Sequence, residues 1–314
     1  MGSVDYKLTN TEEIRVNCPF CVKRGKTPDT KFHLYMNSRK EVYYCFRCGA
    51  RGSFSSLPND LIGIMLDTYS KLPLEKKEVN IRNVFETVYD VLNSLTDFQA
   101  TDSSLIGELY LKQRLFENTS TSTDIPKKLY RILENKTNKS IWIIFFSYNI
   151  WGEIDYYTLR KIFSKVFLNP KFSKPLFKLD IFSAIEKKEA YLVEGIFDAL
   201  SLYLSGIKNV FSLLGKELTD LQTEELLDYG FEKIYIVLDG DAISNEIKIA
   251  NKLKGHFNEV FIGMLPYEKD PNDLRGNINN FIIPFNERVD FILKNKVFLE
   301  KNGIEVLNFI KEAG

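Results

Sequence analysis

The sequence lacks the segments that would carry it out of the cytoplasm. It has no run of about 18 apolar residues, which a membrane-spanning helix needs. Its first residues, MGSVDYKLTNTEEIR, have neither the basic stretch nor the apolar core of a signal peptide. We therefore expect a soluble protein in the reducing environment of the cytoplasm, with no membrane partner.

A net charge is also missing. Lys and Arg together number 42, and so do Asp and Glu, in a chain of 314 residues. The zero sum does not exclude nucleic acid as a partner, because proteins that bind it gather basic residues on one surface whatever their total. With 44% hydrophobic residues, the chain can bury a core and is long enough for two or three domains.

Cysteine is scarce, and its placement is informative. The chain has four cysteines, in the motifs CPFC and CFRC, with 23 residues between the two motifs. Two Cys-x-x-Cys pairs have the spacing of a tetrahedral zinc site. Two disulfides are the alternative, which the missing secretion signal disfavours. We predict one structural Zn2+ with four ligands: Cys18, Cys21, Cys45 and Cys48.

The residues between the two pairs predict a zinc ribbon, which is a hairpin held at its base by the metal. KFHLYMN and EVYYC are strand-like, and SRK between them is typical of a turn. Because so small a ribbon has little core, we expect zinc to supply its folding energy. His33 is either a further ligand or a surface group, and the four cysteines favour the surface group.

The expected ribbon is basic and rich in aromatic residues. Between Cys18 and Gly52, eight basic and two acidic residues leave a charge of +4 once four thiolates and one Zn2+ are included. Basic groups contact phosphates and aromatic faces stack on bases, although some of these rings must fill the ribbon's core. Arg47 and Arg51, beside the last cysteine pair, are the candidates for contacts with a nucleic-acid template.

The segments NVFETVYDVLNSL and SSLIGELYLKQRLF have the apolar spacing of helices. Four apolar residues of the second segment are expected in the core: Leu105, Ile106, Leu109 and Leu115. Residues 140–163 predict two strands around a turn at 149–152. A basic run without an acid follows, and it forms either a solvated face or a ridge for phosphates. Its members are Arg160, Lys161, Lys165, Lys171, Lys174 and Lys178.

From residue 190 onward, strands and helices alternate. AYLVEG, NVFSLLG, KIYIVLDGD and EVFIGML predict strands, and the segments between them predict helices. This order is typical of an α/β fold with a parallel, doubly wound sheet. Right-handed crossovers bring the carboxyl ends of the strands to one edge, where ligands of such sheets bind.

Acidic residues follow these strands and are expected at that edge. They are Glu194 and Asp198 after the first strand, Asp239 and Asp241 after the third, and Asp270 and Asp273 after the fourth. Gathered carboxylates repel one another unless divalent cations bind among them, and ligands that are all oxygen favour Mg2+ or Mn2+. Gly240, between two of the aspartates, is expected to let the chain turn sharply so that both face the metal.

Three motifs of this region resemble the Toprim domain of bacterial and bacteriophage DNA primases: YLVEGIFDALSL, IYIVLDGDA and LPYEKDPNDL. The ribbon, with CPFC and YYCFRCGARGSF, resembles the N-terminal zinc-binding domain of these enzymes. YLKQRLF, YYTLRKI and LNPKFSKPLFK resemble the subdomain that precedes Toprim in them. The resemblance covers most of residues 15–280, in the same order.

The resemblance implies a role for each matching residue. Glu194, Asp239 and Asp241 match the catalytic metal-binding acids, and Asp198 and Asp270 match secondary acids of the same magnesium centre. The residues that match basic groups for template or nucleotide phosphates are Arg160, Lys171 and Lys178. The pattern differs from the family in two places. Many bacterial primases have a histidine among their zinc ligands, whereas this chain has four cysteines, which we associate more with phage enzymes; and Asn272 stands where a carboxylate is common.

The activity that the resemblance implies is that of a DNA primase, a DNA-directed RNA polymerase that makes short RNA primers on single-stranded DNA. Two or more Mg2+ or Mn2+ ions would serve nucleotidyl transfer from ribonucleoside triphosphates, with Glu194 as a metal ligand or a general base. The alternatives are a Toprim-type nuclease or topoisomerase-like enzyme, and a catalytically silent binding module. The sequence has no Gly-x-x-x-x-Gly-Lys-[Ser/Thr] motif, so we expect a replicative helicase to be a separate partner protein.

The same order of motifs predicts the domain organisation. The expected parts are a zinc-ribbon template-binding domain at 1–58, a linker at 59–83, a basic subdomain of the polymerase core at 84–186, a Toprim catalytic domain at 187–280 and a helical tail at 281–314.

Overall fold

The computed structural model describes residues 6–10, 13–37, 40–58, 60–64, 85–101, 104–116, 125–285 and 288–301. The chain divides into two compact units. The first contains residues 1–82 together with Leu226–Gly230, and the second contains 83–225 and 231–314.

The first unit is built on an antiparallel sheet in the order β1-β2-β3-β4-β5. Its strands are β1 (Tyr6–Asn10), β2 (Glu13–Val16), β3 (Leu34–Asn37), β4 (Val42–Cys45) and β5 (Arg51–Ser53). The predicted hairpin is confirmed as β3 and β4, in which Tyr35 pairs with Tyr44. The ribbon is therefore larger than the single hairpin expected from the sequence.

Residues after β5 complete the core of this unit. A short 3-10 helix (Phe54–Ser56) follows β5, and residues 60–64 are helical. Leu61 is buried in the same cluster as Ile14 and Met36. These residues were expected in the linker, but their burial makes them part of the ribbon. The rest of the expected linker, 65–83, lies outside the described residues.

The second unit begins with an antiparallel sheet in the order β10-β9-β8-β7-β6. Its strands are β6 (Phe98–Ala100), β7 (Tyr130–Asn135), β8 (Ile141–Tyr148), β9 (Ile154–Lys161) and β10 (Phe167–Leu168). The predicted strand pair is confirmed as β8 and β9. The expected helix from 84 begins later, as α3 (Val88–Ser94), because Thr87 and Asp90 form a capping box there. Phe85 instead pairs with Ile154 of β9.

The predicted helix at 103–116 is confirmed as α4 (Leu105–Phe116), but its buried face differs from the expectation. Leu115 is buried, whereas three expected core residues are exposed: Leu105, Ile106 and Leu109. The buried face instead contains Gly107, Tyr110 and Leu111. A Cβ atom on Gly107 would lie 2.8 Å from Ile132, so the missing side chain lets α4 approach β7 on this side.

The third sheet has the order β11-β13-β12-β14-β15-β16. Its strands are β11 (Phe177–Lys178), β12 (Glu189–Val193), β13 (Val210–Ser212), β14 (Lys233–Ile236), β15 (Glu259–Gly263) and β16 (Ile282–Pro284). The four central strands are parallel, as predicted, and β11 and β16 add antiparallel edges.

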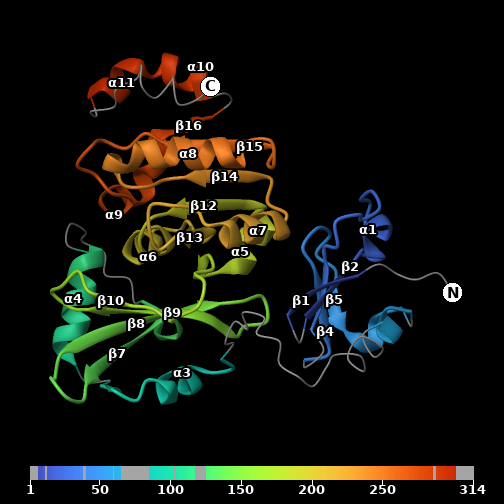
Figure 1. Cartoon of the computed structure of the whole chain (residues 1–314), viewed down its shortest axis with the longest axis horizontal. Helices are drawn as coiled ribbons and strands as arrows, with labels where there is room; N and C mark the ends of the chain where they lie inside the picture. Colours follow the sequence, from blue (N-terminus) through green and yellow to red (C-terminus); the bar gives the residue numbers. More distant parts are fainter. Residues whose placement is uncertain are drawn as a thin grey trace. The chain divides into compact units, whose positions relative to one another are not determined.

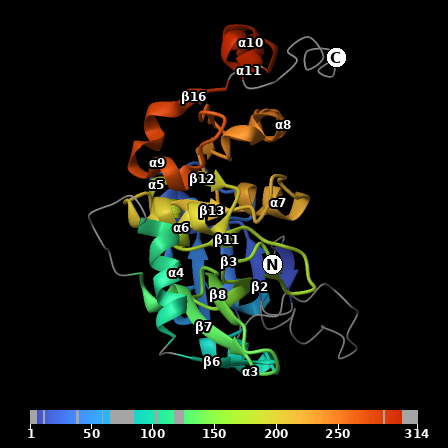
Figure 2. The ribbon, with the colours of Figure 1, turned by 90° about the vertical axis from the view of Figure 1, so that its left-hand side faces the viewer.

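Helices cover both faces of this sheet, which confirms the doubly wound α/β fold. They are α5 (Ile181–Lys187), α6 (Ile196–Leu204), α7 (Asp220–Asp228), α8 (Ile243–Leu253) and α9 (Pro271–Leu274). In Figure 1, α8 lies over β14 and β15. Figure 2 shows α7 and α8 on one side of β12, and α6 and α9 on the other.

The segment expected to be a helical tail begins as part of the sheet. Ile283 in β16 pairs with Ile262 in β15, and only then do α10 (Arg288–Lys294) and α11 (Lys296–Lys301) follow. In the part of the chain that the structure describes, no helix is long and apolar enough to span a membrane.

Candidate zinc-binding and catalytic sites

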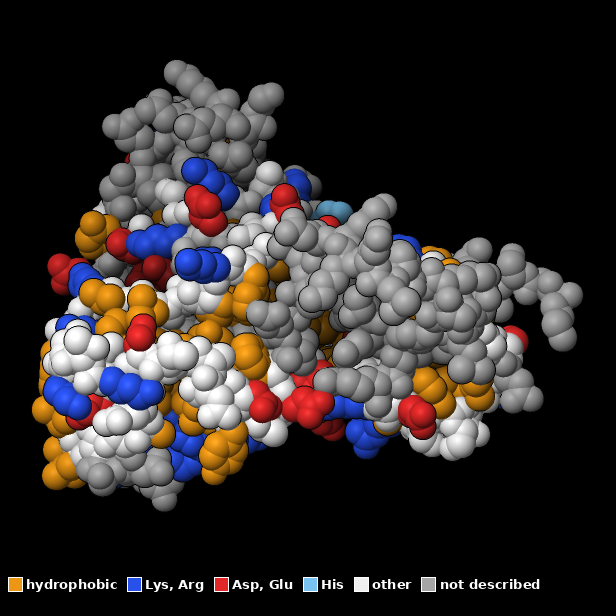
Figure 3. Space-filling view, turned by 60° about the horizontal axis from the view of Figure 1, so that its bottom comes forward, with side chains coloured by type: hydrophobic (Ala, Val, Ile, Leu, Met, Phe, Trp, Pro, Cys, Tyr) orange, Lys and Arg blue, Asp and Glu red, His pale blue; other side chains and the backbone are white. Residues whose placement is uncertain are grey.

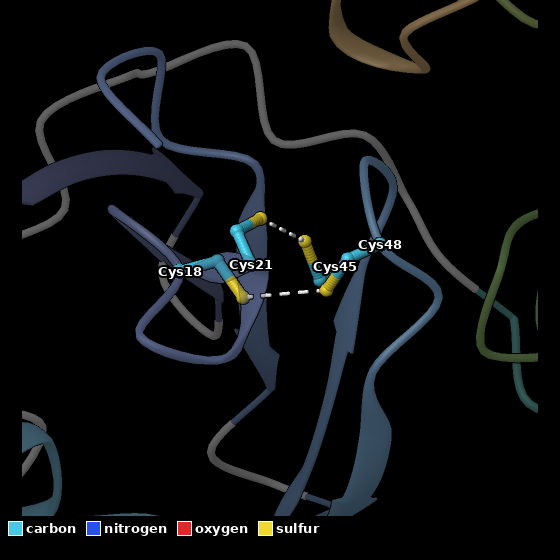
Figure 4. A group of neighbouring side chains, drawn as sticks. All are labelled: Cys18, Cys21, Cys45 and Cys48. Atoms are coloured by element: carbon cyan, nitrogen blue, oxygen red, sulfur yellow. Dashed lines mark hydrogen bonds between the residues drawn. The ribbon is translucent and has the colours of Figure 1, made fainter. Parts of the chain in front are cut away.

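The four cysteines lie together at one end of the ribbon (Figure 4). Cys18 Sγ is 3.8 Å from Cys48 Sγ, and Cys21 Sγ is 3.9 Å from Cys45 Sγ. All four sulfur atoms lie within 4.8 Å of one another. A tetrahedral zinc ion with Zn–S bonds of about 2.3 Å requires sulfur atoms roughly 3.8 Å apart. The cluster is therefore consistent with a zinc site.

Burial and mutual proximity keep the thiols protonated when no cation is bound. Burial and the neighbouring Cys45 and Cys48 raise the pKa of the Cys21 thiol to about 12. A hydrogen bond with Cys18, together with burial, also raises the pKa of Cys45. Without a cation, these thiols would remain protonated at neutral pH. A metal ion stabilises the thiolates directly, so binding and ionisation are coupled.

A buried aspartate, Asp29, supports the loop before β3 and holds the side chain of His33. Asp29 accepts hydrogen bonds from the backbone N–H groups of Cys18 at 2.8 Å and His33 at 2.9 Å. His33 Nδ1 lies 2.6 Å from Asp29 Oδ1. Burial alone would raise the pKa of Asp29, but these hydrogen bonds, with one from Lys31, lower it overall. His33 is thus neither part of the cysteine cluster nor a free surface group.

The two candidate template-contacting arginines differ in their surroundings. The Arg47 guanidinium donates to the backbone oxygens of Thr27 at 2.8 Å and Pro28 at 2.9 Å, and it also bonds the Thr27 hydroxyl. Arg51 lies exposed in β5. Arg47 therefore supports a loop of the ribbon, and Arg51 is the one whose guanidinium faces solvent.

The predicted acids meet at the carboxyl edge of the third sheet, and we call the set the acidic rim. Its members are Glu194, Asp198, Asp239, Asp241, Asp270 and Asp273. Leu192 in β12 pairs with Ile236 in β14, so the backbone segments that follow these two strands leave the sheet side by side. Glu194 follows one of these strands, and Asp239 and Asp241 follow the other.

Close packing around Gly240 joins two motifs of the rim. A Cβ atom on this glycine would lie 2.0 Å from the carbonyl oxygen of Pro266. Its N–H also donates to Lys269 O at 2.8 Å. Gly240 is not among the described glycines with positive φ. The glycine is therefore needed for the close approach of the loop before Asp270, and not for the sharp turn that the sequence suggested.

Three of the rim's acids also cap helices. Asp198 accepts a hydrogen bond from Gly195 N at 3.0 Å at the start of α6. Asp270 accepts one from Asp273 N at 2.7 Å, and Asp273 accepts a longer one from Asp270 N, which forms a capping box for α9. These bonds fix the three carboxylates relative to the first turns of α6 and α9.

Burial and mutual repulsion raise the pKa values of four acids of the rim, which are Glu194, Asp198, Asp239 and Asp270. Burial and then Asp239 raise the pKa of Glu194 to about 7. Burial and then Asp270 and Asp241 raise that of Asp239 to about 6. The pKa of buried Asp198 also rises, first through burial and then through Asp239 and Asp270. These couplings show that the acids of all three motifs act on one another.

The rim has carboxylate oxygens that suit a cation. Among the described residues, Glu194 Oε2 and Asp239 Oδ1 are buried and accept no hydrogen bond. Such oxygens are costly unless a cation or a water compensates them. The acids are nevertheless not drawn together as tightly as the thiols are. Within the described ranges, the cysteine cluster is the one group of three or more such side chains placed to hold a metal ion.

Two residues at the rim were missed by sequence reasoning. Lys216 Nζ donates to Asp241 Oδ1 at 2.9 Å and lies 4.0 Å from Glu194 Oε2. Lys216 follows the strand NVFSLLG, so the rule that gathers strand ends at one edge could have found it. Glu246, buried in α8, accepts a hydrogen bond from Leu238 N at 2.6 Å. No signal in the sequence sets it apart from a surface residue of a helix.

Arg160 links the preceding sheet to the rim. Its guanidinium lies 5.0 Å from the ring centre of Phe197 in α6 and 4.9 Å from that of Phe167. Its Nε donates to the Tyr110 hydroxyl at 3.2 Å. These contacts join Arg160 to α6, the helix in which Asp198 lies. Arg114 in α4 also lies over Phe197, with 5.3 Å between the guanidinium carbon and the ring centre.

The structure places Lys178 where it cannot contact phosphate. The side chain is fully buried, and its Nζ lies 2.6 Å from Asp155 Oδ2 and 3.7 Å from Glu225 Oε1. It also donates to Leu176 O at 2.9 Å. Asp155 accepts a further bond from the Ser147 hydroxyl. Lys178 therefore supports the junction of β8, β9, β11 and α7.

The rest of the basic run has mixed surroundings. Lys171 and Lys165 are exposed, whereas Lys174 Nζ donates to Leu214 O at 2.8 Å. Apolar side chains are also exposed in the hairpin, including Phe163 at 68% and Phe167 at 41%. Figure 3 shows a face of the molecule on which apolar, basic and acidic side chains are interspersed. Exposed rings among cations suit a nucleic-acid surface more than a purely solvated face.

Comparisons with known proteins agree with this arrangement. Residues 191–275 match the protein family described as Toprim-like. The DNA primase of Aquifex aeolicus is 28% identical over 313 residues, which cover 82% of this chain and 60% of that protein. The DNA primase of Rickettsia prowazekii is 24% identical over 316 residues, with 82% of this chain and 51% of the relative covered.

Solved structures give a weaker likeness. The Aquifex aeolicus primase structure, which contains zinc-binding and RNA polymerase domains, is 20% identical, with 98% of this chain and 88% of that chain covered at a TM-score of 0.42. The chain spans between 51% and 60% of the length of the two curated primases above. It is a relative of bacterial DNA primases, and its residues 191–275 form a Toprim-like segment.

Proposed function

We propose that the protein is a DNA primase, which joins ribonucleotides on a single-stranded DNA template by metal-dependent nucleotidyl transfer. One observation carries the proposal. The acids of three separate motifs converge on one sheet edge, in a chain that is similar to DNA primases over 82% of its length. Its substrates, single-stranded DNA and ribonucleoside triphosphates, place its work in the cytoplasm. A separate helicase as partner stays a prediction.

We further propose that the cysteine cluster holds one Zn2+ and that the ribbon contacts the template. The sulfur positions fit a structural zinc site, which closes all four positions around the metal. Arg51 is the better candidate for a template contact, since the Arg47 guanidinium already bonds the backbone at Thr27 and Pro28.

At the acidic rim, Glu194, Asp239 and Asp241 would hold Mg2+ or Mn2+, with Asp198 and Asp270 as further acids of the same centre. Such an ion activates a 3′-hydroxyl group and neutralises the triphosphate. The buried oxygens of Glu194 and Asp239 that accept no hydrogen bond fit such an ion, and Lys216 Nζ lies 4.0 Å from the Glu194 oxygen. Glu194 would serve either as a ligand of the ion or as a general base.

The cations beside the rim would position the polyanionic substrates. Arg160, whose guanidinium lies over the rings of Phe167 and Phe197, would contact a phosphate of the template or nucleotide. Exposed Lys171 would contact the template or nucleotide farther along the same hairpin. Lys178 leaves this set, because its ammonium is already paired and buried.

The test is primer-independent synthesis of RNA on single-stranded DNA with Asp239→Asn and Asp241→Asn. We expect each variant to lose at least about 100-fold in rate, the scale seen when a group that stabilises transition-state charge is removed. Binding of single-stranded DNA should survive. Asp220→Asn is the control, since this acid pairs with Lys252 and its side chain is 95% exposed. Near-normal synthesis by both rim variants, or DNA cleavage without synthesis, would refute the proposal.

A further inference from the structure

The loop after β13 is fastened to the strand end that bears Glu194. The Ser212 hydroxyl donates to Glu194 O at 3.0 Å, and Gly215 N donates to the same carbonyl at 3.1 Å. Two bonds on one backbone oxygen fix the loop in place relative to the first acid of the rim. The residue that follows, Lys216, is therefore held close to the rim by backbone geometry and not only by its charge.

The same loop adopts a conformation that needs support. Leu214 has a φ of 53°, in the left-handed region that residues with a side chain rarely adopt, and Gly215 has a φ of 155°. Lys174 Nζ donates to the carbonyl oxygen of Leu214 at 2.8 Å. Leu213 O accepts a hydrogen bond from the buried Gln222 side chain at 3.1 Å. Two side chains thus hold a turn of disfavoured conformation, and this turn fixes the backbone position of the residue that follows it.

The residue after this turn is Lys216. Its ammonium lies between two acids that follow different strands. Its Nζ is 2.9 Å from Asp241 Oδ1 and 4.0 Å from Glu194 Oε2. The side chain is 41% exposed, that of Asp241 is 50% exposed and that of Glu194 is 22% exposed. The ammonium therefore lies at the open side of the rim, from which a solvated cation would enter.

We propose that Lys216 is the resident counter-cation of the acidic rim, and that it competes with divalent metal ions for Asp241 and Glu194. The inference rests on the metal site proposed above. An ammonium and a divalent ion that share one carboxylate oxygen repel each other, so each weakens the binding of the other. The flexible stem of a lysine lets the ammonium withdraw while the loop stays in place.

This arrangement has two consequences. While the rim holds no metal ion, Lys216 offsets part of the repulsion among its acids and keeps Asp241 facing the site. When a metal ion binds, the free energy of the lysine pair is lost, so the apparent affinity for the ion is lower than that of the acids alone. Lys216 is thus a positioning residue, and removing its charge should strengthen metal binding.

The chain offers a matched control at the opposite end of the same strands. Lys233 Nζ lies 2.9 Å from Glu259 Oε2 and 4.0 Å from Glu189 Oε1, and its side chain is 40% exposed. The two lysines therefore share distances, number of partners and exposure. They differ in one respect, which is that Lys233 pairs with acids outside the rim.

The experiment is titration of the zinc-loaded full chain with Mn2+, in which paramagnetic resonance reports the free ion. Lys216→Gln should bind Mn2+ about two- to fivefold more tightly than the wild type, the range expected for a partly exposed ion pair. Lys216→Arg should remain near the wild type, and Lys233→Gln should be unchanged. As a second readout, Mg2+ should raise the melting temperature of Lys216→Gln by more than that of the other proteins.

Each outcome decides the question. Equal or weaker binding by Lys216→Gln overturns the inference while the metal site stands. The same result for Lys216→Arg and Lys216→Gln shows that shape, and not charge, matters, and it also overturns the inference. If the wild type binds no Mn2+, or binds it as well after Asp239→Asn, the proposed metal site itself fails.

Discussion

The two candidate metal sites of this chain are built in opposite ways. The cysteine cluster comes from two short motifs, and its four sulfur atoms already lie within 4.8 Å of one another. The acidic rim comes from loops that follow β12, β14 and β15, and a lysine lies between two of its carboxylates. The first is compact and largely buried, whereas the second is open to solvent on one side.

The difference fits the functions that we propose for the two sites. A structural zinc site uses all four coordination positions and gains by being closed, since its metal contributes folding energy. A site for nucleotidyl transfer must leave room for substrate oxygens on its metal ions, so its protein ligands stay apart and partly solvated. Ligands that follow separate strands can be held apart from one another, whereas the two cysteines of one Cys-x-x-Cys motif cannot.

The largest effect is expected from removing two ligands of the closed site. Cys45→Ser combined with Cys48→Ser should abolish zinc binding, because two thiolates cannot complete the tetrahedron. Elemental analysis should find about one zinc per wild-type chain and close to none in the variant. His33→Asn is the control and should retain zinc, since His33 bonds Asp29 and lies outside the cluster. Zinc that persists in the double variant would contradict the four-cysteine assignment.

A second variant tests whether Lys178 stabilises the fold of the second unit or binds phosphate. Lys178→Met removes the buried ammonium that pairs with Asp155 and Glu225, so we expect a loss of about 3–5 kcal/mol in the free energy of unfolding. Denaturant unfolding measures this loss. The exposed Lys171→Met should change stability little. Unchanged stability of Lys178→Met, with weaker nucleotide binding, would instead return Lys178 to the phosphate-binding set.

The smallest expected effect is a pH dependence confined to the rim. The folded-state pKa values of about 7 for Glu194 and about 6 for Asp239 lie above the ordinary values of 4.5 and 3.8. Their stabilising contribution is therefore present at low pH and is lost as pH rises through 6 to 7. A bound cation restores it where both acids are ionised. Mg2+ should thus raise the melting temperature more at about pH 8 than at about pH 5.5.

The control for this effect is Asp239→Asn, in which the difference between the two pH values should shrink. Calorimetry on zinc-loaded protein measures both proteins with and without Mg2+. An equal Mg2+ effect at both pH values would show that these carboxylates do not ionise in the predicted range, or that the ion binds elsewhere.

Local spacing made the closed site predictable from the sequence. Two Cys-x-x-Cys motifs and the strands between them indicated the ribbon, and the structure brings the four sulfur atoms together. The alternation of strands and helices likewise indicated the parallel sheet and the edge at which the acids gather. What the sequence did not show was the packing around these motifs. Gly240, for example, is required by the carbonyl of Pro266, which is 26 residues away in the chain.

Side chains whose partners are distant in the sequence were the main source of error. Lys178 belonged to a basic run, but its partners Asp155 and Glu225 come from β9 and α7, so its burial left no local signal. The face of α4 was misjudged because Gly107, which has no side chain, determines which side approaches β7. Lys216 was not predicted, because only acidic residues were considered among those that follow the strands.

The central claim is that the closed site serves template recognition while the open site performs the chemistry. It is tested by comparing two activities in the same full-length proteins: starting RNA on single-stranded DNA, and extending an RNA primer that is already annealed. We predict that Cys45→Ser combined with Cys48→Ser starts few chains but still extends, and that Asp239→Asn does neither. If the cysteine variant starts primers at the wild-type sites and rate, or if the aspartate variant still extends, the account is wrong.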